Sequence, residues 1–175
     1  TMELAKAING DSMTATKPTT DKSSKGDGNN ITQTNEATGN TKVSTANGNT
    51  ITDATTGATT ASTAGTATYN DKQGNVTVAD GTGTNVTDQA GNNAHYGATG
   101  STITNAAGNT TTVTGDNITV GGSNPVTVNG NTGTVNGLSN TTWDPNTIVS
   151  GQAATEDQVS QATKNATDAL VNTGF

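Results

Sequence analysis

Short stretches of this chain alternate apolar and polar residues, and they lie between glycine-containing turns. The two-residue period of strands that are buried on one side is present in Val76-Thr-Val78, Ile118-Thr-Val120 and Val126-Thr-Val128. We therefore predict a β region from about Ile31 to Gly137. Its strands are short because turn-forming residues interrupt them repeatedly.

Gly-Asn pairs recur through this region and predict turns beside short Thr/Val strands. They occupy positions 39–40, 48–49, 74–75, 91–92, 108–109 and 130–131. The pairs at 74, 91 and 108 are 17 residues apart, which indicates stacked strands with a loose internal repeat. Residues 52–68 carry no side chain larger than Thr or Asp. There we predict either an exposed, mobile excursion or a strand that backbone pairing alone holds in place.

The N-terminal part follows other patterns. Leu4 and Ile8 are spaced as on one face of a helix, and Asn9-Gly10 is a plausible helix end, so residues 1–10 predict a short helix. Residues 11–30 combine Pro18 with lysines and small polar residues, a composition typical of a linker.

A second helix is predicted near the C-terminus. Thr155 and Gln158 fit a capping box, and acidic residues occupy the first turn, where the helix dipole favours negative charge. Two seams with coiled-coil spacing fit this helix equally well, and each covers only about two heptads. One seam is Val159, Ala162, Ala166, Ala169 and Thr173; the other is Val159, Thr163, Ala166, Leu170 and Thr173.

The chain has too few large apolar residues for a core of its own. Leu, Ile, Val and Phe make up roughly one residue in eight, below the level of about 20% at which a packed core becomes doubtful. Two interpretations follow: a disordered chain, or an oligomer in which each chain supplies part of a shared core. Only 12% of the residues are charged, and Thr, Gly and Asn are abundant. This composition favours the ordered β oligomer.

Charge and cysteine content exclude several classes of function. The net charge is −7, there is no arginine, and the lysines are scattered, so we expect no nucleic-acid binding. The absence of cysteine excludes a disulfide framework and thiolate metal sites. No apolar run approaches the roughly 18–20 residues of a membrane-spanning helix. No signal peptide is visible, and we expect the chain to be a piece of a longer protein.

One segment differs from everything around it and holds the only Trp of the chain. It begins Leu138-Ser-Asn-Thr-Thr-Trp-Asp and ends Ser150-Gly-Gln-Ala-Ala-Thr-Glu-Asp-Gln-Val159. This segment resembles the neck regions of trimeric autotransporter adhesins. These are fibrous outer-membrane proteins of Gram-negative bacteria, in which β-rich heads alternate with coiled-coil stalks.

The resemblance implies a mainly β homotrimer in four parts: a short helix and polar linker over residues 1–30, a head over 31–137, a Trp-containing junction and neck over 138–155, and the start of a parallel trimeric coiled coil over 156–175. The head is expected to be β-prism-like or β-solenoid-like. The Asn-Ser-x-Ala-Ile-Gly repeats of many family heads are absent, so a transverse β-prism is the expected type. In such a trimer, each inward Val or Ile meets its two symmetry copies.

The resemblance also assigns roles to single residues. Those expected to pack at the trimer junction are Trp143, Leu138, Ile148 and Val149. Those expected to form the helix cap and the neck seam are Thr155, Gln158, Val159, Ala162, Ala166 and Ala169, although Leu is common in the family where Val159 stands. A lone Trp also stacks on sugars or partners in other proteins, and this stays the alternative role of Trp143.

No motif for catalysis, for a cofactor or for a metal is present. His95 has no second His, Cys or carboxylate in its motif, so we expect it, with Tyr96, in a loop or at the surface. These two residues are the first choice for a receptor contact within the head. An enzyme that cleaves polysaccharides would need clustered charged residues, and only three Glu are present.

The leading functional hypothesis is a fragment of a bacterial cell-surface adhesin that binds host matrix, host cells, abiotic surfaces or other bacteria multivalently. The resemblance places its membrane anchor outside this chain. One alternative is a monomeric, Thr-rich β-solenoid that binds ice or polysaccharide. The other alternative is a structural spacer of the fibre that binds nothing.

Overall fold

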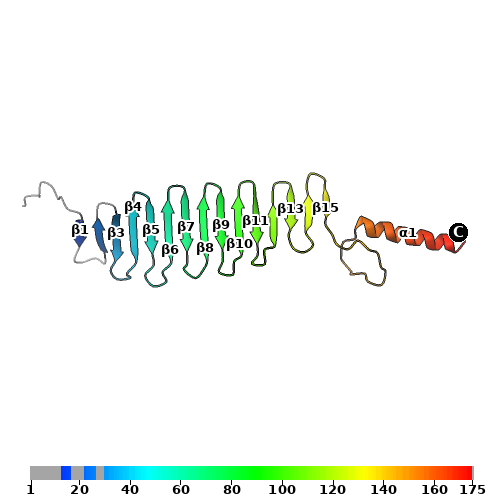
Figure 1. Cartoon of the computed structure of the whole chain (residues 1–175), viewed down its shortest axis with the longest axis horizontal. Coiled ribbons are helices and arrows are strands. Elements are labelled where there is room, and N and C mark those ends of the chain that lie inside the picture. The colour runs from blue at the N-terminus through cyan, green and yellow to red at the C-terminus, as the bar shows by residue number, and fades with distance from the viewer. Residues whose placement is uncertain (1–12, 17–21, 27–29, 175) are drawn as a thin grey trace, which may run out of the picture. The chain divides into compact units, whose positions relative to one another are not determined.

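The computed structural model describes residues 13–16, 22–26 and 30–174, with side chains from residue 30 onward. The fold is mainly β, with antiparallel strands and a C-terminal helix (Figure 1). The chain divides into two compact units, Thr1–Gly108 and Asn109–Phe175, which we describe separately. In both units the strand order in the sheet is the order along the chain.

In its described part the first unit is an up-and-down meander, in which each strand pairs antiparallel with the next. Its strands are β1 Met13–Thr16, β2 Lys22–Gly26, β3 Asn30–Asn35, β4 Thr41–Thr45, β5 Gly48–Thr52, β6 Thr59–Thr63, β7 Thr66–Asn70, β8 Val76–Asp80, β9 Gly83–Thr87, β10 Asn93–Gly97 and β11 Gly100–Thr104. The turns are too short for parallel pairing. The alternative of a β-solenoid is therefore wrong for this unit, because the successive coils of a solenoid pair in parallel.

A hairpin of 17 residues is the repeating element, and it explains the period of the Gly-Asn pairs. β6, β8 and β10 begin at Thr59, Val76 and Asn93, 17 residues apart. Each repeat contains two five-residue strands, one short turn and one longer turn. The longer turns need a left-handed residue, and glycine adopts this conformation without strain. Four glycines of the predicted pairs have φ near 90°: Gly39 (75°), Gly74 (104°), Gly91 (90°) and Gly108 (87°).

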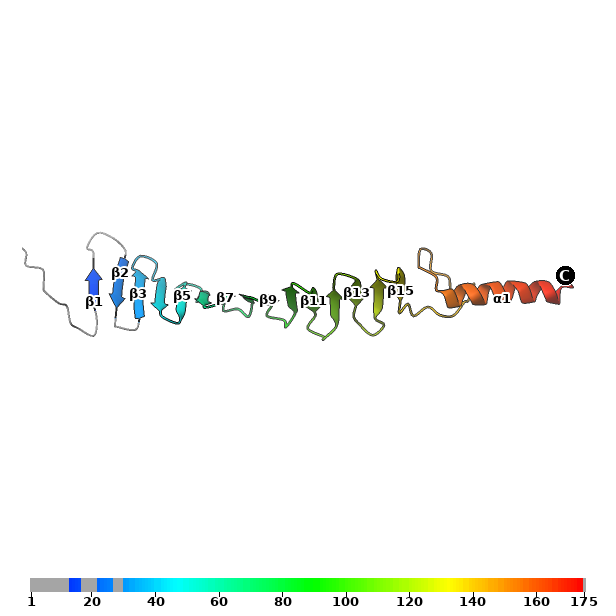
Figure 2. The ribbon, with the colours of Figure 1, turned by 90° about the horizontal axis from the view of Figure 1, so that it is seen from above.

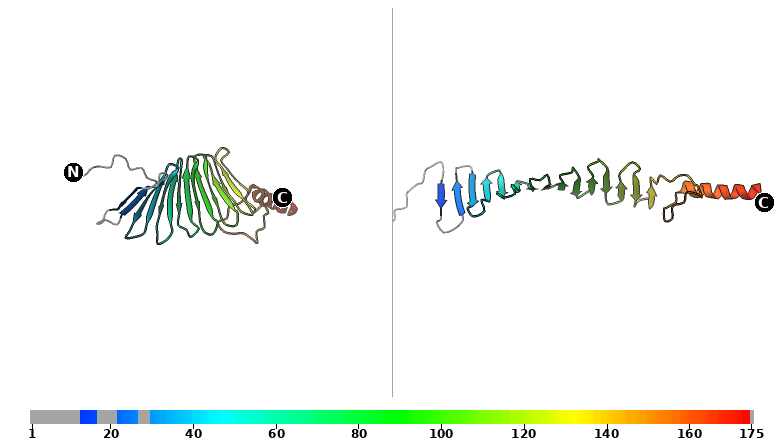
Figure 3. Two further views of the ribbon diagram at one scale, coloured as in Figure 1. Left: turned by 60° about the vertical axis from the view of Figure 1, so that its left-hand side comes forward. Right: turned by 90° about the horizontal axis from the view of Figure 1, so that it is seen from below.

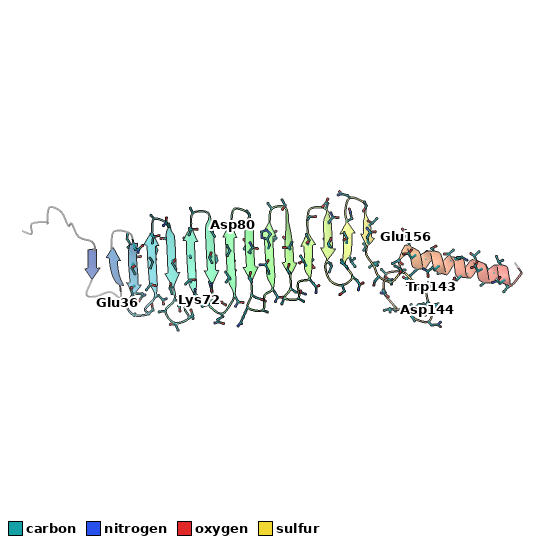
Figure 4. The ribbon with its side chains drawn as sticks, in the orientation of Figure 1. Glu36, Lys72, Asp80, Trp143, Asp144 and Glu156 are labelled. Carbon is teal, nitrogen blue, oxygen red and sulfur yellow. The ribbon has the colours of Figure 1, made fainter. Side chains whose placement is uncertain are left out.

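The sheet of the first unit is a single layer. Seen from above, neither a helix nor a second sheet covers the strands in the described part of this unit (Figure 2). The strands twist progressively along the layer (Figure 3), as the handedness of β-strands requires. The longer turns containing Glu36 and Lys72 lie at one edge, and Asp80, beside a short turn, lies at the opposite edge (Figure 4).

Two described parts of the first unit bear on the sequence-based expectations. Strands β1 and β2 lie within residues 11–30, where composition predicts a linker. Residues 52–68 are not an excursion, because β6 pairs with both of its neighbours through the backbone; this is the second of the two predicted alternatives. The helix predicted over residues 1–10 lies outside the described residues.

The second unit contains a four-stranded antiparallel meander, a loop and a helix. Its elements are β12 Thr110–Val113, β13 Asn117–Val120, β14 Val126–Asn129, β15 Thr134–Asn136 and α1 Glu156–Asn172. Beyond α1, Gly174 is left-handed with φ of 90°, which accounts for the end of the helix. Among the described residues, no helix has the length and apolar content needed to cross a membrane.

Candidate functional site

The loop before α1 is tied to the first turn of the helix by Thr155 and Gln158. The capping box that these residues predict is present: the Thr155 hydroxyl accepts from the Gln158 amide at 3.2 Å, and Gln158 Oε1 accepts from the Thr155 amide at 3.3 Å. The Thr155 hydroxyl also donates to the carbonyl of Asn140 at 2.9 Å. The cap therefore fixes both the helix start and the loop.

Two glutamines of α1 continue this attachment along the loop. Gln158 Nε2 donates to the Thr142 carbonyl at 2.9 Å, and Gln161 Nε2 donates to the Thr141 carbonyl at 2.7 Å. Gln161 Oε1 accepts from the backbone amide of Trp143 at 3.0 Å. Three side chains at the helix start, those of Thr155, Gln158 and Gln161, thus bond four backbone groups of the loop. One of these groups is the amide of Trp143, which ties the backbone at Trp143 to α1.

The four residues predicted to pack at a trimer junction fall into two places. Trp143, Ile148 and Val149 line one small hollow beside the start of α1. Leu138 lies instead in a hollow between β15 and the helix start. Trp143 is half-buried, whereas Ile148 and Val149 are 64% and 63% exposed. Figure 4 places Trp143 and Asp144 near Glu156, the first residue of the helix.

The helix α1 presents apolar side chains that no residue of the described chain covers. Val159 is 58% exposed and Leu170 is 59% exposed, and no residue of the helix is buried. Of the alanines in the predicted seam, Ala162 is half-buried, and Ala166 and Ala169 are exposed. Both predicted seams therefore stay open as contact surfaces.

The sheet of the second unit sorts its residues by face. Cross-strand pairing places one row on one side: Val113 opposite Ile118, Ile118 opposite Val128, and Val128 opposite Val135. Val120 and Val126 pair with each other on the same side. We call these six residues the valine face. Their neighbours along each strand point to the other side, because successive side chains of a strand alternate.

The opposite side of this sheet carries Thr and Asn. We call it the Thr119 face, and its residues are Thr110, Thr112, Asn117, Thr119, Thr127, Asn129, Thr134 and Asn136. The hydroxyls of Thr119 and Thr127 lie 3.1 Å apart across two strands. Six of these eight residues are half-buried in the single chain, and only Thr134 and Asn136 are exposed.

His95 and Tyr96 occupy strand β10, not a loop, because they pair with Asn85 and Thr84 of β9. As strand neighbours they point to opposite sides of the sheet. His95 is half-buried, with Nδ1 at 3.2 Å from Asn85 Oδ1. Tyr96 is 75% exposed. The two predicted contact residues therefore do not form one site.

Asparagines at the ends of the longer turns link neighbouring hairpins. Asn40 Oδ1 accepts from the Ala54 amide at 2.9 Å, Asn75 Oδ1 from the Gln89 amide at 3.2 Å, and Asn92 Oδ1 from the Ala106 amide at 2.8 Å. We call these bonds the asparagine ladder. Ala58 stands at the equivalent position between the first two, and it lacks the amide needed for a rung. There the amide of Lys72 donates to Asn70 Oδ1 at 2.7 Å instead.

Aspartates begin these turns, and their carboxylates accept hydrogen bonds within the same turn. The Thr56 backbone and hydroxyl hold the pKa of Asp53 below its usual range. The Asn75 side chain, and then the Gln73 amide, lower the pKa of Asp71. The side chain and backbone of Asn92 do the same for Asp88. Since each lowered pKa follows from local turn bonding, these carboxylates serve structure and are not poised for acid–base chemistry.

The described residues contain no group of three or more His, Cys, Asp or Glu side chains placed to hold a metal ion. Asn140 and Gln161 are the junction residues that the sequence reasoning missed. Gln161 follows Gln158 by three residues and so shares its helix face, which is the signal that would have found it. The chain matches no protein-family model, no curated protein and no solved structure.

Proposed function

We propose that this chain is a segment of a trimeric surface fibre through which a bacterium attaches to host cells or matrix, to surfaces or to other bacteria. The observation that carries the proposal is the lack of an interior: no described residue is buried. A chain with regular strands, a capped helix and no core needs a cover from outside itself. Identical copies supply that cover in a homotrimer.

The surface area supports the same proposal. The chain exposes 12844 Å². A folded monomer of 17.3 kDa exposes about 7,800 Å² by the usual scaling of area with mass. The excess, about 5,000 Å², is comparable to the area that obligate oligomers bury.

The junction supports a fibre in which a β-rich part feeds a helical stalk. The loop that carries Trp143 is hydrogen-bonded to the helix start, so the path of the chain into α1 is defined. The apolar residues left on α1, among them Val159 and Leu170, are available for two neighbouring helices. Attachment by such a fibre is multivalent, because three identical faces and many fibres per cell raise avidity.

Sedimentation equilibrium tests the proposal. We expect a species of three times the 17.3 kDa chain mass, with β and helical signals by circular dichroism. A folded monomer would contradict the trimer. A second arm extends α1 with a trimeric coiled coil in heptad register, since a short helix holds register weakly. If the extended protein shows no β signal, the proposal fails as well.

A second candidate function, binding of ice or polysaccharide, is favoured by one observation. Thr34, Thr41, Thr52 and Thr59 lie opposite one another on four successive strands. Strand spacing places such hydroxyls about 4.8 Å apart, as a regular surface. Thermal-hysteresis and glycan-array measurements test this candidate. Cell binding of the trimer is then compared with that of a version whose exposed turns are replaced. If neither ice nor polysaccharide binds, and the trimer binds cells no better than the altered version, the segment is a spacer.

A further inference from the structure

Three Asn-Gly pairs lie among the residues that the structure describes, at positions 47–48, 129–130 and 136–137. In such a pair the asparagine amide is open to attack by the backbone nitrogen of the glycine, because glycine has no side chain to hinder the close approach. The attack needs a glycine amide that donates no hydrogen bond and an asparagine side chain that can move. The three pairs differ in both respects.

Two of the pairs are held in turns by hydrogen bonds. The Gly48 amide donates to the Thr45 hydroxyl at 3.1 Å. The Gly130 amide donates to the Asp116 carbonyl at 2.7 Å. The side chain of Asn129 is fixed as well, because its Oδ1 accepts from two further backbone amides of the turn at 2.9 Å and 3.2 Å. Attack by either glycine nitrogen therefore requires the turn to open first.

The pair at 136–137 lacks this protection. Asn136 ends β15, which is the last strand in the order of the sheet, and all three residues of β15 are exposed. Within the described part of the chain, the Gly137 amide donates no hydrogen bond. The Asn136 side chain makes a single bond, from Nδ2 to the Thr134 hydroxyl at 2.9 Å. Both requirements for the attack are therefore met here.

We infer that Asn136 is a site of spontaneous deamidation, and that the pairs at 47–48 and 129–130 are protected in the folded chain. Hydroxide removes the proton of the Gly137 amide, whose nitrogen then bonds to Asn136 Cγ. The side-chain nitrogen takes a proton from water and leaves as ammonia. Water next opens one of the two C–N bonds of the succinimide ring, which gives aspartate or isoaspartate. The net reaction consumes one water, releases one ammonia and involves no oxidation.

Deamidation places a new negative charge beside two acidic residues. Asn136 and Gly137 line the hollow between β15 and the helix start, together with Glu156 and Asp157. A carboxylate at position 136 is repelled by both acidic side chains. Isoaspartate also adds a carbon atom to the main chain, between the sheet and the loop that carries Trp143. We therefore expect the reaction to weaken the connection between β15 and α1.

Peptide mass spectrometry after incubation at mildly alkaline pH measures the reaction, because an amide and a carboxylate differ in mass. Asn129 is the matched control, since the sequence Val-Asn-Gly occurs at both 128–130 and 135–137. In the folded full chain we expect Asn136 to react at least roughly tenfold faster than Asn129, because the Gly130 amide must first lose its hydrogen bond. In denaturant the two rates should be equal. Water enriched in heavy oxygen should label the new carboxylate.

Equal rates at Asn129 and Asn136 in the folded chain, or a faster rate at Asn129, would overturn the inference. A difference of the same size in denaturant would do so too, since the fold would then not set the rates. Asn136→Gln should abolish the product at this position and leave the rate at Asn129 unchanged. Sedimentation of the same samples tests the proposed trimer separately, so a monomer that loses the Asn136 amide would contradict the proposed function alone.

Discussion

The sheets of the two units distribute their apolar residues differently. In β12–β15 every Val and Ile lies on the valine face. In the first unit, Ile51 and Tyr69 lie on one side, whereas Val43 and Val78 lie on the other, among threonines. The second sheet thus needs one face covered to gain stability. The first sheet depends more on its turns, where aspartates and the asparagine ladder organise the backbone.

The largest expected effect comes from a charge on the valine face. Val128→Asp would bury a carboxylate without a partner and should destabilise the assembly by about 3 kcal/mol or more. Thr127→Asp, the matched control on the Thr119 face, should cost less than about 1 kcal/mol. Denaturant unfolding with sedimentation at each concentration measures both. Equal losses for the two variants would contradict the difference between the faces.

The second-largest loss of stability is expected from removing the helix cap, which lies in the second unit. Thr155→Ala removes the cap and the bond to the Asn140 carbonyl, so we expect a loss of about 1–2 kcal/mol and lower helicity by circular dichroism. The control is Thr167→Ala within α1, where the hydroxyl donates to the Thr163 carbonyl and supports no loop. Thr167 lies in neither predicted seam, so that change should be nearly neutral. A loss for Thr167→Ala as large as for Thr155→Ala would argue against a special role of the cap.

The asparagine ladder of the first unit should give a smaller effect. Asn75→Ala leaves the Gln89 amide without its acceptor and also removes the side-chain bond to Asp71 within the turn. Together these losses should cost about 1 kcal/mol in thermal unfolding. Gln73→Ala, in the same turn, keeps the ladder and serves as the control. Adding the missing rung by Ala58→Asn should change stability little, because the Lys72 amide is already bonded to Asn70. A large gain from Ala58→Asn would show that the local bond does not replace a rung.

Acid should loosen the longer turns of the first unit, and this is the smallest expected effect. The pKa values of Asp53, Asp71 and Asp88 are lowered by turn hydrogen bonds, so folding favours the charged carboxylates. Their contribution is present above the unfolded pKa of about 3.9 and is lost as the pH falls through the lowered folded pKa. Hydrogen exchange of the turn amides, corrected for intrinsic rates, should be constant from about pH 5 to 7 and faster below about pH 4. A variant with all three replaced by Asn should lack the acid step, and an unchanged step would contradict the assignment.

Much of the fold follows from local sequence, because local chemistry sets turns and caps. The Gly-Asn pair at 74–75 predicts a turn since glycine is needed for the left-handed position, and Thr155 with Gln158 predicts the helix start. The lysines and small polar residues of 11–30 predict a linker, and this prediction is wrong for β2. Backbone pairing to β3 supports β2 although it contains no strong strand formers. The lack of a second His, Cys or carboxylate in its motif predicts His95 in a loop or at the surface. Pairing with Asn85 of β9 places it in strand β10 instead.

The remaining parts of the candidate site depend on contacts between distant residues. The hydrogen bond between Gln161 and the backbone amide of Trp143 joins residues 18 apart. The spacing of Gln161 from Gln158 indicates a shared helix face, but it does not indicate the partner on the loop. The two sides of the second sheet follow from the register of β13 on β14, which pairing alone determines. The alternation in Ile118-Thr-Val120 predicts a half-buried strand, but it does not say what buries it.

Thermal unfolding at several protein concentrations tests the central claim, that this chain folds by covering itself with copies of itself. If folding and trimer formation are coupled, the midpoint rises with chain concentration, because association stabilises the folded state by mass action. We expect this rise in the circular dichroism signals of both strand and helix. A cooperative transition whose midpoint does not depend on concentration, in a sample that sediments as a monomer, would contradict the account.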